Sequence, residues 1–182
     1  MDALVPGFVA ETPREHALAG DPLLRAGLAW GRPRPGHPEG AVGAHAGAIL
    51  RAIDVGGELR ADLRFLALVH DAFKFRVVPE RGWSPDNDHA VLARRFAERY
   101  TSDARLLTAL ELHDEPYWIW KTADGCVAAL HALLERVPDT GLFLRFVELD
   151  ASTAGKDPGL LAWVRAATRG AARRHEPSRL AA

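Results

Sequence analysis

Residues 66–74 read LALVHDAFK, a run of apolar side chains that leads directly into His70 and Asp71. Apolar residues at helical spacing here and upstream predict a buried helix, so we expect an imidazole and a carboxylate side by side in the interior. A charge away from water is strongly unfavourable unless it is paired. A divalent cation satisfies both groups, because a neutral imidazole donates a lone pair and an aspartate brings negative charge and two oxygens that can bridge two metals.

Lys74 follows this pair at one helical turn, four residues after His70 and three after Asp71. On a continuing helix its ammonium group faces the same space as the carboxylate. There it either neutralises Asp71 or contacts an anionic group of a substrate. A single His-Asp dipeptide is a weak signal, since such pairs also occur on solvent-exposed helix faces.

Further histidines and aspartates strengthen the signal because they recur along the chain, at His45, His89, His113-Asp114 and Asp150. Each of these histidines falls on a different predicted helix. Helical bundles build metal sites from side chains on facing helices. The series therefore predicts a metal centre.

The spacing of apolar residues is helical along the chain, and the alternation typical of strands is absent. Helices are predicted at residues 21–30, 41–55, 58–76, 87–101, 103–114, 122–137, 139–152 and 157–173, with turns rich in Pro, Gly and Asp between them. Residues 31–40 read as a Pro- and Gly-rich loop, and segments 78–86 and 115–123 could flank a pocket. We expect an all-α, single-domain helical bundle over residues 1–182, with its core at about 35–155 and a C-terminal helix and tail at 157–182.

The composition excludes several classes of protein. A formal net charge of -1 gives no basic bias toward nucleic acid or an anionic membrane, so neither is expected as a partner. Cys126 is the single cysteine and can form neither an internal disulfide nor a thiolate metal cluster. With no apolar stretch long enough to span a bilayer and no signal sequence over residues 1–14, a cytoplasmic location is expected. The oligomeric state is left open.

The order of the candidate ligands resembles that of the HD domain superfamily of metal-dependent phosphohydrolases, an all-helical fold named for its His-Asp pair. The resemblance covers about residues 35–155, and its defining pair would be His70-Asp71 rather than His113-Asp114, since only the first has histidines before and after it. Supporting features are His37-Pro38-Glu39-Gly40 before His45, the His-Asp-x-x-Lys arrangement that ends at Lys74, and Phe146-Val147-Glu148-Leu149-Asp150.

The resemblance implies a role for each residue of the series. His45, His70, Asp71 and Asp150 would hold one metal, Asp71 would bridge to a second, and His89 and His113 would hold that second ion. Members of the family with only the four-residue set bind one metal, whereas members with two further histidines usually hold two. Two divalent ions are therefore expected, of iron, manganese, cobalt, nickel or a similar metal.

The activity that the resemblance implies is hydrolysis of a phosphoester in a nucleotide or another small phosphorylated metabolite. A hydroxide that bridges the metals would attack phosphorus, with Asp71 and Lys74 as the catalytic residues and Lys74 assisting the anion. Cyclic dinucleotides are disfavoured as substrates, because Ala72-Phe73 departs from the His-Asp-x-Gly-Lys signature of those phosphodiesterases and their Gly-Tyr-Pro motif is absent.

Two alternative functions remain. The first is oxidation of a small substrate at a mixed-valence di-iron centre, because HD-type oxygenases use a closely similar set of four His and two Asp. The second is a non-catalytic, metal-containing domain that binds a ligand, which an intact ligand set argues against.

Several other residues have more than one interpretation. Asp114 and Glu115 are candidates for a general acid or for groups that orient the metal ligands, or are solvated carboxylates at a helix end. Tyr117, Trp118 and Trp120 either line a pocket or pack in the core. Residues left out of the site are His16, His37, His131, His175, Arg51 and Arg76.

Overall fold

The computed structural model describes residues 1–34, 38–122 and 126–174, with the side chains given as far as residue 166. Within these ranges the chain forms α-helices and short 3-10 turns and no β-strand, which confirms the all-α prediction. The helices are α1 (Pro13–Gly20), α2 (Pro22–Ala29), α3 (Val42–Ala52), α4 (Gly57–Val69), α5 (His89–Ala97), α6 (Ala104–Leu112), α7 (Glu115–Thr122), α8 (Val127–Leu134), α9 (Thr140–Ala151) and α10 (Pro158–Arg174). The 3-10 turns are η1 (Lys74–Arg76), η2 (Pro79–Arg81) and η3 (Pro85–Asn87).

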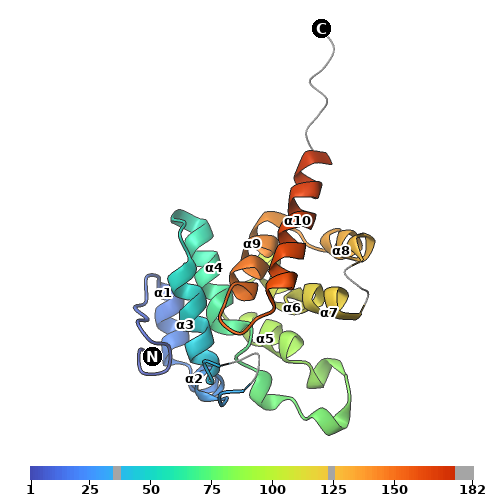
Figure 1. The fold of residues 1–182 in the computed structure, drawn as a ribbon. Helices are drawn as coiled ribbons and strands as arrows, with labels where there is room; N and C mark the ends of the chain where they lie inside the picture. The colour runs from blue at the N-terminus through green and yellow to red at the C-terminus, as the bar shows by residue number, and fades with distance from the viewer. Residues whose placement is uncertain (35–37, 123–125, 175–182) are drawn as a thin grey trace.

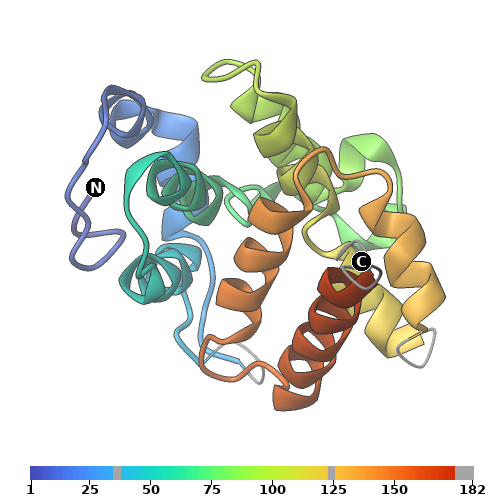
Figure 2. The same cartoon turned by 90° about the horizontal axis from the view of Figure 1, so that it is seen from above.

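The helices pack in neighbouring pairs, and α4 contacts α3, α6 and α9 (Figures 1 and 2). Helix α3 lies beside α4, α5 lies beside α6, and α9 contacts α4 on one side and α10 on the other. Helices α7 and α8 form a further pair, of which α7 contacts α10. This arrangement brings α3, α4, α6 and α9 together at one place in the molecule.

Helix α4 is central because its second half is buried on all sides, as expected of a helix that is apolar around its whole circumference. Residues 65–69 are at most 1% exposed, and Phe65 packs in the same core as Phe143 and Phe146 of α9. Burying one side chain of this size contributes about 1.5–3 kcal/mol. The core extends from Val5 near the N-terminus to Val164 in α10.

A buried ion pair joins the N-terminal segment to α4. The guanidinium of Arg64 donates to Glu15 at 2.8 and 2.9 Å and to the carbonyl oxygen of Val9 at 2.7 Å. Both side chains are almost completely buried, so each charge depends on the other. The first helix is thereby held against α4.

The main errors of the sequence prediction concern three helices. The helix predicted at 58–76 ends at Val69, and the chain continues through a turn into η1. Helix α1 was missed although Thr12 caps it and Pro13 begins it. Helix α7 lies in segment 115–123, for which no helix was predicted, and its Pro116 is in the first helical turn, where proline is tolerated. The other predicted helices are present, with ends shifted by up to five residues.

Two of the histidines set aside above, His37 and His175, lie outside the described residues. Among the helices that are described, none combines the length and the apolar character needed to cross a membrane.

Candidate metal centre

The candidate ligands are brought together by the ends of several helices. His45 lies within α3, whereas His70 and His113 each directly follow the last residue of a helix, α4 and α6 respectively. His89 begins α5, whose N-terminus is capped by the side chain of the preceding residue. Asp150 lies at the end of α9. All six predicted ligands thus meet where α3, α4, α5, α6 and α9 converge.

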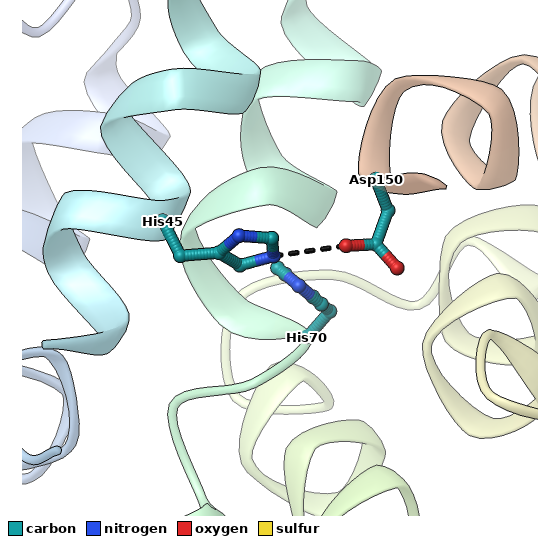
Figure 3. A group of neighbouring side chains, drawn as sticks. All are labelled: His45, His70 and Asp150. Carbon is teal, nitrogen blue, oxygen red and sulfur yellow. Dashed lines mark hydrogen bonds and ion pairs between the residues drawn. The ribbon is translucent and has the colours of Figure 1, made fainter. Parts of the chain in front are cut away.

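The first of two groups that could hold a metal ion consists of His45, His70 and Asp150 (Figure 3). One ligand atom from each residue lies within 4.8 Å of the others. His45 and Asp150 point toward one another from α3 and α9, with 2.9 Å between His45 Nε2 and Asp150 Oδ1. Burial opposes ionisation of Asp150, but Lys156 and His45 outweigh it and hold the pKa of its carboxyl well below the usual value.

His70 provides the clearest indication of a missing partner. Its Nδ1 lies 3.3 Å from the carbonyl oxygen of Leu66 and 3.2 Å from that of Ala67, and since carbonyls only accept, we assign the proton to Nδ1. The other ring nitrogen, Nε2, is buried and has no hydrogen-bond partner. Burial lowers the pKa of His70 to about 3, so the ring is neutral. A buried lone pair without a partner is costly, and a metal ion would satisfy it.

The second group consists of Asp71, His89 and His113. Asp71 Oδ1 lies 3.4 Å from His89 Nε2 and 3.5 Å from His113 Nε2, and the two Nε2 atoms are 3.3 Å apart. His113 Nδ1 donates to the carbonyl oxygen of Leu110 at 2.7 Å, which directs Nε2 toward the group. This is the orientation that metal-binding histidines commonly adopt.

Asp71 connects the two groups. While Oδ1 faces His89 and His113, Oδ2 lies 3.6 Å from His70 Nε2 and accepts from Lys74 Nζ at 2.6 Å. The geometry therefore places one carboxylate oxygen beside each group. Lys74 reaches Asp71 through η1 rather than along the continuing α-helix that was predicted.

The electrostatics of the centre favour positive charge between its carboxylates. Burial raises the pKa of Asp71, but Lys74 and His70 outweigh it and keep the pKa well below the usual value. Burial also disfavours a charged His113, yet Asp114 and Asp71 raise its pKa to about 9. The space between these side chains thus attracts a proton, and a divalent cation would be attracted for the same reason.

Asp114 lies closer to the centre than the sequence indicated. Its Oδ2 is 3.3 Å from His89 Nε2 and its Oδ1 is 3.6 Å from His113 Nε2. Burial raises the pKa of Asp114, but the positive charges of His113, His89 and Lys74 lower it by more. The net pKa is below the usual value, so the carboxyl is ionised. The repeated His-Asp dipeptide was the signal that could have placed it in the ligand set.

Glu39 is an acidic residue beside the centre to which the sequence analysis assigned no role. Its Oε1 lies 3.4 Å from His45 Nδ1, on the side of the ring opposite Asp150. A carboxylate on the far nitrogen of a metal-binding histidine fixes the orientation of the ring and raises its basicity.

Two hollows of several hundred cubic ångströms flank the centre in the described part of the chain, and they share Asp114 and Trp118 in their walls. The first, of about 610 Å³, is lined by Lys74, His113, Asp150 and residues of α7 and α10. The second, of about 580 Å³, is lined by His89, Trp83, Glu115 and Arg136 among others. Both volumes are in the range of small-molecule sites.

The other residues with more than one interpretation lie in the walls of the hollows, and some of them also pack against the core. Tyr117, Trp118 and Trp120 all line the first hollow, and Tyr117 and Trp120 also pack against the hydrophobic core, so both interpretations hold in part. Glu115 lies 3.5 Å from Arg136 at the second hollow. The other described residues that were set aside, namely His16, His131, Arg51 and Arg76, line neither hollow.

A comparison of the chain with protein-family models, curated proteins and solved structures found no match. The helical architecture and the two His/Asp groups are compatible with an HD-type fold.

Proposed function

We propose that the protein is an HD-type, metal-dependent phosphohydrolase that holds two divalent ions and acts on a small phosphorylated molecule. The observation that carries this proposal is the pair of His/Asp groups joined by Asp71, with the buried Nε2 of His70 in the first group left without a hydrogen-bond partner. The donors are nitrogen and oxygen atoms, which suit iron, manganese, cobalt or nickel.

The six residues would divide between the ions by position. His45, His70 and Asp150 would hold one ion and His89 and His113 the other, with one oxygen of Asp71 directed to each. When bound, the ions would supply Lewis-acid activation of a water molecule and neutralise the oxygens of a phosphoryl group.

Lys74 and Asp114 would act on the substrate from the wall of the larger hollow. Lys74 is held by Asp71 and lines this hollow, where its ammonium can pair with a phosphoryl oxygen. Asp114 is ionised, so it can accept a hydrogen bond from a water molecule and orient that water. Its lowered pKa makes it a poor general acid.

A di-iron oxygenase is the second candidate, because the same four histidines and two aspartates would serve a redox pair of irons. Oxygen uptake with iron in both positions and no phosphate release would support that activity. A metal-containing domain without activity is the third candidate.

The test combines elemental analysis of the purified protein with a phosphatase screen over nucleotides and general phosphoesters. Two ions per chain with phosphate release support the proposal, whereas absence of metal after reconstitution contradicts it. We expect His70→Ala and Asp71→Ala to lose metal and activity together while they remain helical by circular dichroism. His131→Ala, on α8 and away from the centre, is the matched control and should lose neither.

A further inference from the structure

The lysines of this chain gather at one place. The sequence contains twenty arginines and only three lysines, Lys74, Lys121 and Lys156. All three line the 610 Å³ hollow beside the candidate metal centre. Since arginine is the usual cation elsewhere in the chain, the use of lysine here points to a function that needs compact, mobile ammonium groups.

Two of these lysines each contact one aspartate of the centre. Lys74 donates to Asp71 at 2.6 Å, and Lys156, from the segment between α9 and α10, lies 3.5 Å from Asp150 Oδ1. Each His/Asp group thus has one ammonium beside its carboxylate, and both lysines line the hollow. Two ammonium groups in the wall of one hollow suit an anion with two negative charges.

The third lysine lies with the aromatic residues of α7. Lys121 Nζ donates to the hydroxyl of Tyr117 at 3.1 Å and lies 5.7 Å from the centre of the Trp118 ring. Trp118 is 52% exposed, which is high for so large an apolar side chain, and Trp120 and Leu160 line the hollow as well. Exposed aromatic rings in a hollow are suited to pack against a flat ring.

We propose that this hollow binds an aromatic phosphomonoester that carries a second anionic group. Lys74 and Lys156 bind the phosphoryl group, Trp118 packs against the aromatic ring, and Lys121 pairs with the second anion. The cleavage of the phosphoester rests on the proposed function. The binding of the ligand can be measured separately.

Phosphonates provide the probes, because a phosphohydrolase does not cleave their C–P bond during a titration. We would measure the dissociation constants of 4-phosphonobenzoate, phenylphosphonate and methylphosphonate by isothermal titration calorimetry, with Mn²⁺ present. Packing of a ring on Trp118 predicts that phenylphosphonate binds about tenfold more tightly than methylphosphonate. The carboxylate of 4-phosphonobenzoate should strengthen binding about threefold more through Lys121.

Single variants separate the three contributions. Lys156→Met should weaken all three ligands by about tenfold, with Lys156→Arg closer to the parent protein. Trp118→Leu should remove the preference for phenyl over methyl, and Lys121→Met should remove only the preference for the carboxylate. Arg165→Met, which removes an exposed cation of α10 outside the hollow, is the control and should bind as the parent does.

Equal affinity for all three ligands, or parent-like binding by Lys156→Met, would overturn this inference. Metal content and phosphate release are recorded independently of it. If the protein releases phosphate but does not prefer aromatic over aliphatic phosphoesters, the proposed function is retained and this inference is rejected. If the three phosphonates bind in the expected order of affinity but the purified protein holds no metal and releases no phosphate, the proposed function is rejected and the binding site is retained.

Discussion

At the residue scale, Asp71 is the side chain on which the centre depends. Its two oxygens face different groups, which is the geometry that a bridging role requires, whereas Asp150 faces only one group. Both carboxylates were found in the sequence as neighbours of apolar helix residues. Their different roles were expected only through the family resemblance, and the structure supplies the geometry for them.

This difference leads to a prediction for two isosteric variants. Asp71→Asn should reduce the content of both ions, because the amide removes negative charge from both groups. Asp150→Asn should reduce the content of one ion only. Elemental analysis of both proteins after reconstitution tests this, and equal losses would contradict the bridging role of Asp71.

His113 predicts how the metal-free protein responds to pH. Its pKa is about 9 in the folded protein and 6.5 is its usual value. Between these values the folded state holds a proton that the unfolded state has released. The stabilising contribution of His113 is therefore complete below about pH 6.5 and is lost as the pH rises through 9.

We expect the free energy of unfolding of chelator-treated protein, measured with urea, to fall from pH 6.5 to pH 9. His113→Gln should show a weaker dependence over the same range. Metal-loaded protein should also show a weaker dependence, because the ion takes the place of the proton. An identical slope in the chelated parent and in His113→Gln would contradict the assignment.

At the element scale, the turn that carries Asp71 is positioned by close packing against α2. A methyl group placed on Gly27 of α2 would lie 1.7 Å from the carbonyl oxygen of Ala72, which directly follows Asp71. No heavy atoms could remain at that distance, so only glycine allows the observed approach of α2 to this turn.

Gly27→Ala should therefore displace the Asp71 turn and weaken metal binding as well as the fold. We expect a loss of about 1–3 kcal/mol in the free energy of unfolding, the range for overpacking of a closely packed interior, together with a higher dissociation constant for Mn²⁺. Gly20→Ala in α1 is the matched control, since a methyl group there meets no atom within 4 Å. If Gly27→Ala binds metal as tightly as the parent protein does, the position of the turn does not depend on α2.

At the scale of the whole molecule, the centre joins parts of the chain that are far apart in sequence. His45 and Asp150 are 105 residues apart and lie 2.9 Å from one another. Metal binding at this point would hold together α3, α4, α5, α6 and α9, each of which supplies a ligand or directly precedes one. A ligand that binds only the folded state stabilises it by mass action.

Addition of Mn²⁺ at about 100 times its dissociation constant should raise the stability of the parent by about 2.7 kcal/mol for each site that the ion fills. Differential scanning calorimetry would record this as a higher Tm. His70→Ala should show no comparable increase, since it lacks the buried Nε2. An equal shift in both proteins would indicate that the cation acts elsewhere.

The sequence alone determined the all-α class and the residues of the His/Asp series, because both are local patterns: helical spacing of apolar residues, and ligand residues next to buried stretches. It did not identify α7, the end of α4 at Val69, or the positions of Asp114 and Lys156. Those features depend on packing between helices that are distant in the chain. Only the tertiary structure showed how closely the ligand atoms of each group approach one another and that all three lysines line one hollow.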